Sequence, residues 1–333
     1  MRIAVTGANG YVGSALCQYL LDQGLKVTAL IRQHRQSTSP ELVNNHLRLE
    51  KVDYQAPSSL VRALTGADAV IHLIAKTHAK DALSEIDEYR ATNLGISQVV
   101  AQAAAQAGVK RLVFLSSIKV NGEHTGPTPF RNSDQPAPTT AYGISKLEAE
   151  QALAQCCQNQ LELVILRPPL IYSADAKGNI SALKNAILRG WPLPLARIDN
   201  KRSIIDLNLL CDYLYKSCIT AEANGKTLLI SNHHPASTPE LVQRIGTDIA
   251  RQPLLLPVPT PLLKVASKLL GKQEQFTKLC GNLEIDPTET EHLLQPNTDS
   301  PQPHSTHKPT NLSQLKSSPD QAQTKPQDTS FQP

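Results

Sequence analysis

The sequence predicts an α/β fold: a doubly wound parallel sheet, a smaller mixed C-terminal region and a disordered tail. Short apolar runs alternate with amphipathic helical runs over the first half of the chain. The alternation loosens after about residue 168, and the composition changes sharply near Pro296. Unbroken apolar strands separated by helices are typical of a parallel sheet that helices cover on both faces.

The elements follow one another in a regular order. Strands are expected at the strand-like segments 3–6, 26–31, 47–52, 69–74, 112–116 and 161–166. Helices are expected where apolar residues recur at helical spacing, at 11–23, 83–107 and 142–158. Ser237, followed by Pro239 and Glu240, has the pattern of a helix N-cap.

The composition limits the domain organisation. A chain of 333 residues with 40% hydrophobic residues is long enough for about two domains. The last 38 residues hold seven prolines and only four apolar residues, too few to offset the entropy lost on folding. We therefore expect two ordered regions at 1–168 and 169–295, and a disordered tail at 296–333.

Several classes of protein are disfavoured. The net charge of +4 is too small to indicate nucleic-acid binding. No apolar run reaches about 18 residues, so no transmembrane segment is expected. The six cysteines lack regular spacing and the first residues lack an apolar leader, which predicts a cytoplasmic protein with reduced thiols. His304 and His307 have no carboxylate or thiol cluster nearby, so no metal site is expected.

A glycine-rich turn joins the first expected strand to the first helix. Gly7 and Gly10 permit a tight turn that can approach a pyrophosphate, and Gly13 permits close packing of the helix on the sheet. The N–H groups at the start of the helix add a positive potential for phosphates. The pattern predicts a dinucleotide site formed by Gly7, Asn9, Gly10, Tyr11, Val12 and Gly13; the alternative is an ordinary strand–helix turn.

The end of the second expected strand indicates which dinucleotide binds. An acidic residue about 20 positions after the glycine turn suits the ribose of NAD, whereas an arginine suits the 2′-phosphate of NADP. Arg32 occupies this position and Arg35 follows it. The sequence therefore favours NADP(H) over NAD, unless Arg32 is simply a solvated surface residue.

A tyrosine and a lysine lie four residues apart on the helix expected at 142–158. This spacing places Tyr142 and Lys146 on one helical face. A nearby cation favours the phenolate form of tyrosine, which can take a proton from an alcohol while a hydride leaves for a nicotinamide. Ser116 and Ser117 end the fifth expected strand, at the edge where ligands bind in such sheets. The pattern predicts an oxidoreductase site; the alternative is a surface helix pair.

With these motifs the sequence resembles the extended short-chain dehydrogenase/reductase family, in its nucleotide-sugar epimerase/dehydratase branch. The similarity extends from residue 1 to about 294 and rests on TGANGYVG at 6–13, VDY at 52–54, HLIA at 72–75, TNLG at 92–95, FLSSIKVNGE at 114–123, YGISK at 142–146, LRPPLIY at 166–172 and KGN at 177–179. The resemblance implies a Rossmann-type NAD(P)-binding domain at 1–168 and a nucleotide-sugar-binding region at 169–295. The chain is similar to UDP-glucose 4-epimerase-like proteins and to 4-ketoreductases of bacterial surface-polysaccharide pathways.

The resemblance also implies roles for individual residues. Ser117, Tyr142 and Lys146 would be the catalytic residues, and Lys146 would also hold the cofactor ribose. Asp53 would contact the adenine, and Asn93 would support the active-site helix. The nucleotide diphosphate of the substrate would meet Lys177, Asn179 and Arg202. The family's usual Tyr-Gly-Pro-Gly turn is replaced by residues 172–175, which puts the shape of the substrate loop in doubt.

Among the reactions of the branch, dehydration is disfavoured. It needs an Asp-Glu pair after the catalytic serine, where this chain has Ile118 and Lys119. We place a UDP-hexose or UDP-N-acetylhexosamine 4-epimerase first and an NADPH-dependent 4-ketoreductase of a UDP-4-keto-6-deoxy sugar second. A non-catalytic NAD(P)-sensing regulator is a third hypothesis, which would not need Tyr142 or Lys146. A homodimer through two long helices is common in the family.

A short helix expected at 261–271 has two interpretations. It carries leucines toward one side and Lys264 and Lys268 on another. It could lie in a membrane interface near a lipid-linked sugar. We favour the plainer interpretation, a helix that packs on its own domain.

Overall fold

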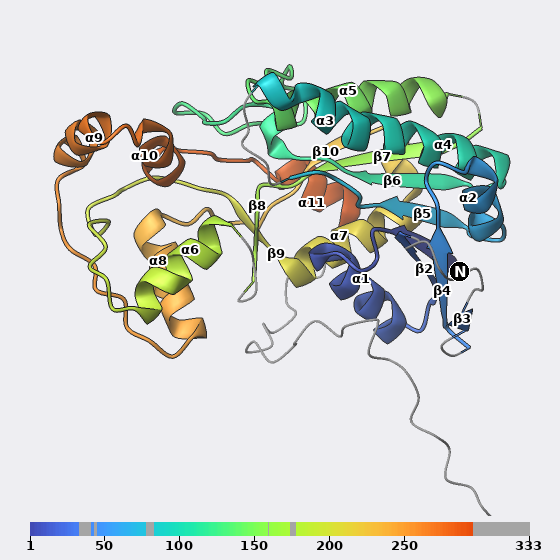
Figure 1. Cartoon of the computed structure of the whole chain (residues 1–333), viewed down its shortest axis with the longest axis horizontal. Helices are drawn as coiled ribbons and strands as arrows, with labels where there is room; N and C mark the ends of the chain where they lie inside the picture. Colours follow the sequence, from blue (N-terminus) through green and yellow to red (C-terminus); the bar gives the residue numbers. More distant parts are fainter. Residues whose placement is uncertain (33–40, 43–44, 78–82, 159, 174–177, 296–333) are drawn as a thin grey trace, which may run out of the picture.

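The computed structural model describes residues 1–32, 41–42, 45–77, 83–158, 160–173 and 178–295, so the predicted tail at 296–333 lies outside the described residues. Figure 1 shows a large sheet covered by helices and, beside it, a smaller lobe built mostly of helices. Among the described residues, no helix is both long and apolar enough to cross a bilayer.

The large sheet confirms the predicted α/β class. Its order is β10-β7-β6-β5-β1-β2-β4-β3, and within the described residues every pairing is parallel except that of β3 with β4. The strands are β1 (Arg2–Thr6), β2 (Lys26–Arg32), β3 (Glu41–Leu42), β4 (Leu47–Val52), β5 (Ala69–His72), β6 (Arg111–Leu115), β7 (Glu162–Arg167) and β10 (Thr227–Leu229). The six strands expected from the sequence all form, with ends that differ by at most two residues. The two short strands β3 and β10 were not predicted.

The strands at the centre of the sheet have contiguous apolar residues because both faces of the sheet are buried. Successive side chains of a strand point to opposite faces. In β1, Ile3 and Val5 pack on one face, whereas Ala4 packs on the other. The first face is covered by α1 (Tyr11–Asp22) and α7 (Leu207–Ile219), the second by α2 (Pro57–Leu64), α4 (Ile96–Gln106) and α5 (Ala141–Cys156) (Figure 1). This is the predicted doubly wound arrangement.

The long helix expected at 83–107 is interrupted. It begins with a turn of 3-10 helix, η1 (Leu83–Glu85), continues as α3 (Ile86–Tyr89), widens into a stretch of π-helix, η2 (Arg90–Gly95), and ends as α4. Short π-helical stretches occur frequently at functional sites. The buried Asn93 lies in this stretch, and its contacts with α5 are described below.

The smaller lobe has its own core. It contains α6 (Asn179–Leu188), α8 (Thr238–Asp248), α9 (Thr260–Leu269) and α10 (Gln273–Cys280) and joins the sheet through the parallel pair β8 (Leu170–Tyr172) and β9 (Ile204–Asp206). The predicted helix start is confirmed, since Ser237 caps α8 and Glu240 completes a capping box.

Not all of 169–295 belongs to this lobe. α7, β10 and the end of α11 (Thr288–Leu294) pack with the large sheet, so the chain passes between the two parts more than once.

Candidate active site at the carboxyl edge of the sheet

The strand order reverses beside β1. The chain leaves β1 toward β2 and β4 and returns later to β5 on the other side of β1. In open parallel sheets, ligands bind at such a reversal, in the crevice outside the carboxyl ends of the strands. The 7–13 turn follows β1, and Ser116 and Ser117 follow β6 at the same edge. Because only β5 separates them, at a spacing of about 4.8 Å, these two strand ends lie roughly 10 Å apart.

The glycine turn adopts a geometry that other residues would not permit. Gly7 has a φ of 69°, which L residues rarely adopt. A Cβ on Gly13 would lie 2.2 Å from the carbonyl oxygen of Gly7, so only glycine permits this packing of the helix on the turn. Within the described residues no side chain caps α1, and its first turn holds no acidic residue. The N–H groups at the start of α1 are therefore suited to phosphate oxygens, and the turn fits a dinucleotide.

The other residues of the turn lie in different environments. Asn9 and Gly10 are exposed, whereas Val12 packs partly against the core of the first face. The Tyr11 hydroxyl hydrogen-bonds the hydroxyl of Ser173, just after β8. Tyr11 thus ties the turn to the segment that leads into the smaller lobe.

Arg32 and Asp53 lie together on the opposite side of the glycine turn from Ser117. Arg32 ends β2 and pairs in register with Val52, the residue before Asp53. Both charged residues are exposed. The Asp53 carboxylate accepts a hydrogen bond of 2.9 Å from the N–H of Gln55, which fixes the start of the following turn. The two side chains therefore suit the adenosine half of a dinucleotide; Arg35 lies outside the described residues.

The structure brings Ser117, Tyr142 and Lys146 to one place. Ser117 caps a short 3-10 helix, η3 (Ile118–Val120), by accepting a hydrogen bond of 3.3 Å from the N–H of Lys119. A Cβ on Gly143 would lie 2.6 Å from the carbonyl oxygen of Lys119, so the start of α5 packs directly on this segment. Tyr142 is half-buried beside that contact.

The side chain of Lys146 contacts the end of β6. Its ammonium donates a hydrogen bond of 2.8 Å to the carbonyl oxygen of Leu115 and lies 3.8 Å from the ring centroid of Phe114. Burial lowers the pKa of Lys146 from 10.5 to about 7, and the carboxylate of Glu150 opposes this shift. The hydrogen bond and the ring contact together fix the position of the ammonium.

Burial of Lys146 should make stability depend on pH. Between about pH 7 and 10.5 the unfolded chain binds more protons at this residue than the folded chain, so the free energy of unfolding should rise with pH there. The slope from one such group is at most about 1.4 kcal/mol per pH unit. Urea unfolding at a series of pH values should show this rise in the wild type but not in Lys146→Met. Parallel curves for the two proteins would contradict the prediction.

Sequence reasoning missed a buried ion pair behind the serines. Arg167 donates hydrogen bonds of 3.0 and 2.5 Å to the two carboxylate oxygens of Glu150, which also accepts a hydrogen bond from the Ser116 hydroxyl. Arg167 further donates to the side-chain oxygen of Asn121 at 2.9 Å. Glu150 lies four residues after Lys146, so the helical spacing was the available signal. The pair fixes the end of β7 against α5 beneath the site.

A second buried network holds the start of α5 from the other side. Asn93 donates a hydrogen bond of 2.9 Å to the hydroxyl of Ser145, which donates one of 2.8 Å to the carbonyl oxygen of Tyr142. Ser97 bonds the carbonyl oxygen of Asn93 at 2.6 Å and contacts His72 at 2.9 Å. Burial, with a smaller effect of the Lys146 charge, lowers the pKa of His72 to about 3, so His72 is neutral. Asn93 therefore contacts the helix that the resemblance assigned it to support.

Sequence reasoning also missed a charged pair near the Tyr142 ring. The Lys119 ammonium lies 5.9 Å from the Tyr142 ring centroid and 3.3 Å from the carboxylate of Glu123. Thr140, the N-cap of α5, donates a hydrogen bond of 3.2 Å to Glu123. Lys119 lies in η3, but Glu123 follows it in the next turn, so their contact depends on the fold of that turn. Tyr142 thus shares α5 with Lys146, four residues later, and has the Lys119 ammonium near its ring.

The predicted substrate residues are less well defined. Lys177 lies outside the described residues, and so does the side chain of Asn179, whose backbone begins α6. Arg202 is half-buried and donates a hydrogen bond of 2.8 Å to the carbonyl oxygen of Gly281. Burial lowers the pKa of Arg202, and the charge of Glu123 opposes this. Arg202 therefore belongs to the same charged neighbourhood as Glu123.

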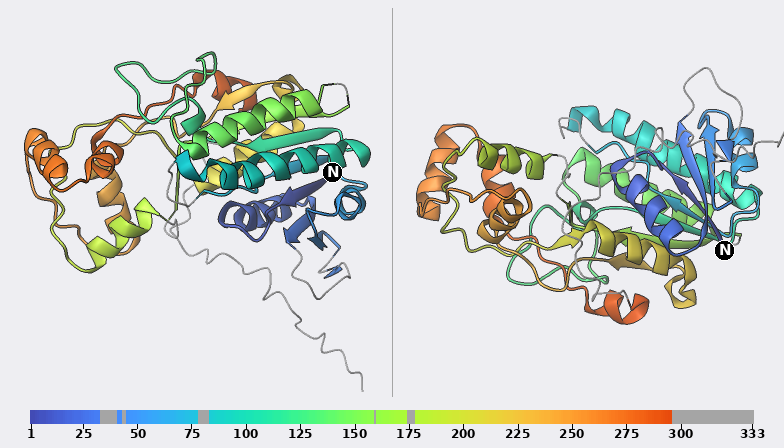
Figure 2. Two further views of the ribbon diagram at one scale, coloured as in Figure 1. Left: turned by 45° about the horizontal axis from the view of Figure 1, so that its top comes forward. Right: turned by 90° about the horizontal axis from the view of Figure 1, so that it is seen from below.

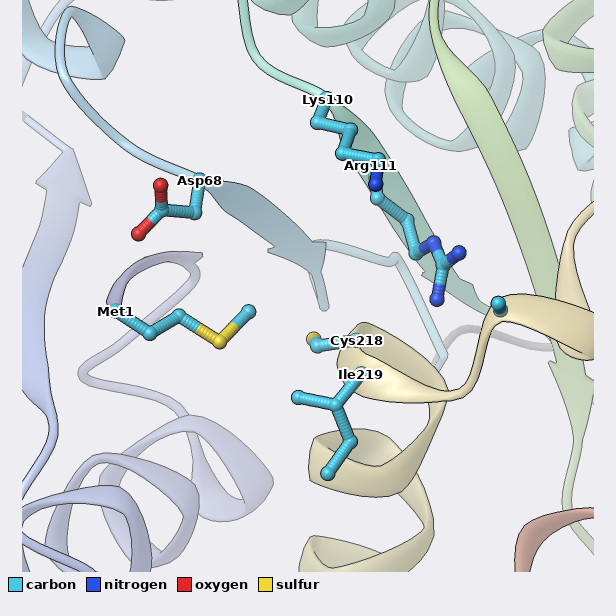
Figure 3. Close-up of a pocket in the computed structure, with 7 residues that line it drawn as sticks. Met1, Asp68, Lys110, Arg111, Cys218 and Ile219 are labelled. Carbon is cyan, nitrogen blue, oxygen red and sulfur yellow. The ribbon is translucent and has the colours of Figure 1, made fainter.

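A cavity elsewhere does not compete with this site. It has a volume of about 450 Å³ and lies at the amino edge of the sheet, where Figure 3 shows Met1 and Asp68 across from Arg111 and Cys218. Arg111 is already paired with Glu162 through a hydrogen bond of 2.7 Å. Ligands of parallel sheets bind at the carboxyl edge, which favours the crevice beside β1.

Comparison with known families agrees with this geometry. The profile of the NAD dependent epimerase/dehydratase family matches residues 3–215. The chain belongs to this family. The resemblance inferred from the motifs is therefore confirmed, and this member of the family is an NAD(P)-dependent epimerase/oxidoreductase.

Individual relatives cover most of this epimerase/dehydratase family member. A UDP-glucose 4-epimerase of Vibrio cholerae is 33% identical over 299 residues, 88% of this chain and 89% of the relative. A 2-alkyl-3-oxoalkanoate reductase of Stenotrophomonas maltophilia is 30% identical over 257 residues, 74% of each protein. The solved structure of MoeE5 in complex with UDP-glucose and NAD has a TM-score of 0.70 at 22% identity and covers 91% of this chain and 95% of that chain. At this identity the solved structure shows the common fold alone.

Proposed function

We propose that the protein is a nucleotide-sugar 4-epimerase that acts on a UDP-hexose or UDP-N-acetylhexosamine in the synthesis of surface-polysaccharide precursors. The main support is the meeting of Ser117, Tyr142 and Lys146 at the sheet edge that carries the glycine turn. The similarity to the Vibrio cholerae UDP-glucose 4-epimerase over most of the chain supports the reaction.

Different residues would bind the different parts of the cofactor. The N–H groups of the 7–13 turn would hold the pyrophosphate, with Gly7, Asn9, Gly10, Tyr11, Val12 and Gly13 forming its walls. Arg32 and Asp53 would hold the adenosine, and Lys146 the other ribose. When bound there, a nicotinamide supplies reversible hydride exchange with carbon 4 of the sugar.

Tyr142 would act as the general base and acid. It takes the proton of the sugar 4-hydroxyl and returns it after the sugar has turned its other face. The charges of Lys146 and Lys119 stabilise the phenolate form, while the Ser117 hydroxyl donates a hydrogen bond to the reacting oxygen. Arg202, with Lys177 and Asn179, would bind the diphosphate, for which the planar guanidinium is well suited.

A 4-ketoreductase that consumes NADPH is the second candidate. Arg32 favours it, because a 2′-phosphate would be neutralised there. The similarity to a 2-alkyl-3-oxoalkanoate reductase adds support for reduction.

Incubation with a panel of UDP- and dTDP-hexoses, with and without NADPH, separates the two candidates. For an epimerase, NMR should show interconversion at carbon 4 without added cofactor. If product formation required one NADPH per turnover, the protein would be a 4-ketoreductase and the epimerase proposal would be wrong. No reaction with any sugar of the panel would count against both.

The preference for NADP(H) can be tested at Arg32. A charge-assisted hydrogen bond contributes about 1.5–3 kcal/mol, so Arg32→Asp should weaken NADPH binding roughly 10- to 100-fold and affect NADH much less. Fluorescence titration of both dinucleotides gives the ratio of the dissociation constants. Arg62→Asp, at an exposed position on α2, is the matched control and should leave the ratio unchanged. Equal affinity of the wild type for NADH and NADPH would contradict the preference.

A further inference from the structure

Helix α9 carries an apolar stripe that faces solvent. Its large members are 58–82% exposed: Leu262, Val265, Leu269 and, just after the helix, Leu270. They recur at i, i+3, i+7 and i+8, so they share one side of the helix. No residue of α9 is buried, and Leu263 alone among its leucines packs against the core of the lobe. The expected packing of this helix on its own domain therefore leaves its main apolar face uncovered.

The position of α9 in the fold makes this face accessible. Figures 1 and 2 place α9 at the end of the smaller lobe that is farthest from the large sheet. The stripe is thus remote from the carboxyl edge that carries Tyr142 and Lys146. A planar surface could approach α9 without contact with the crevice.

Lysines border the stripe. At about 100° per residue the apolar stripe spans roughly 140° of the helix, and Lys264 and Lys268 lie along one flank of it. Both are exposed, and so is Lys272 immediately after the helix. Residues 260–281 contain four lysines and one acidic residue, Glu274. The face therefore combines exposed leucines with a positive border.

We propose that α9 is a membrane-interface helix that docks the protein on a bilayer with anionic headgroups. The leucines of the stripe would enter the boundary between headgroups and acyl chains, and Lys264, Lys268 and Lys272 would contact the lipid phosphates. A short helix with an apolar face and a lysine-rich border has the features of one that lies on a bilayer rather than across it. This inference does not depend on the proposed function.

Charge and composition argue against two other ways to cover the stripe: a second copy of the chain and the segment 296–333. A two-fold contact between copies centred on the stripe would bring the lysine borders of both copies into one interface, and this concentration of like charge is unfavourable. The segment 296–333 holds three lysines and three aspartates and only four apolar residues, so it has neither a net negative charge nor enough apolar surface to cover the stripe. An anionic lipid surface matches both the leucines and the lysines.

Vesicle co-sedimentation of the full-length protein tests the proposal. The wild type should pellet with vesicles of phosphatidylcholine and phosphatidylglycerol, less with phosphatidylcholine alone, and less at high salt. The double variant Leu269→Gln/Leu270→Gln should lose at least about tenfold in vesicle affinity, because two leucines no longer leave water. Lys264→Gln/Lys268→Gln should lose the preference for anionic vesicles.

Control variants separate the stripe from general surface effects. Leu188→Gln, at a leucine that is 50% exposed on α6, and Lys110→Gln, at a lysine whose side chain is 76% exposed, should pellet like the wild type. All variants should keep wild-type thermal unfolding. Absence of pelleting, or pelleting that the stripe variants do not reduce, would overturn the proposal. A dimer in sedimentation velocity that Leu269→Gln/Leu270→Gln abolishes would assign the stripe to a second copy instead.

Discussion

Replacement of Tyr142 by Phe is expected to lower turnover about 10²–10⁴-fold while dinucleotide binding and stability change little. General acid–base catalysis by a positioned side chain contributes a factor of that size. The substitution removes only the hydroxyl, so the ring can keep its place near the ring of Tyr89, 6.2 Å away between centroids. Steady-state rates on the nucleotide sugar that the wild type converts, together with dinucleotide titration, measure both effects.

A matched tyrosine makes this result specific. Tyr215 lies on α7, among the helices that cover the first face of the large sheet. Tyr215→Phe should keep at least half of the wild-type rate, since the change removes one hydroxyl at a position away from the candidate site. If Tyr142→Phe were as active as Tyr215→Phe, the role of Tyr142 as general base would have to be abandoned. The hypothesis of a non-catalytic sensor would then regain support.

The electrostatic setting of Tyr142 shows what the sequence could and could not predict. The spacing of Tyr142 and Lys146 is local and helical, so it predicted one shared face correctly. Lys119 was used only as a reason against dehydration, yet its ammonium lies 5.9 Å from the Tyr142 ring centroid. That contact depends on how η3 packs against α5, which arises only in the folded chain. Sequence spacing alone therefore missed a charged side chain near the phenol.

In the fold, too, local features were predicted from the sequence and long-range contacts were not. Strands such as β1 and β6 were predicted because their apolar residues are contiguous and flanked by turn residues. β10 was missed because it has three residues, and only its pairing with the distant β7 makes it a strand. The packing of α7 against the large sheet was likewise not visible in its sequence. Long-range pairing, and not local propensity, decides such elements.

For α9, the element itself was predicted correctly, but the orientation of its apolar side was not. Its helical pattern was predicted, and so were its apolar and basic sides. The expectation that the apolar side faces the protein followed from the usual arrangement of surface helices. In the structure Leu269 is 82% exposed, so the helix uses a different side, that of Leu263, to contact the lobe. Periodicity identifies an apolar face but does not say what covers it.

The buried pair of Glu150 and Arg167 should have the largest effect on stability. Their side chains are 5% and 6% exposed, so removal of one partner leaves the other as a buried, uncompensated charge. Glu150→Leu is expected to lower the free energy of unfolding by about 3–5 kcal/mol. Glu150→Leu/Arg167→Met should recover much of this loss, because an apolar pair of similar volume avoids the desolvation cost of both charges. Urea unfolding at constant pH measures all three proteins.

An ion pair that joins α5 to η2 is the control that separates burial from charge. Arg90 and Glu148 form a hydrogen-bonded pair at 2.6 Å, but their side chains are 43% and 27% exposed. Because water replaces the lost partner there, Glu148→Leu should cost no more than about 1 kcal/mol. Equal losses for Glu148→Leu and Glu150→Leu would show that desolvation is not the cause. A large loss confined to Glu150, reversed in the double variant, would show that the ends of β6 and β7 depend on this neutralised pair beneath Ser116.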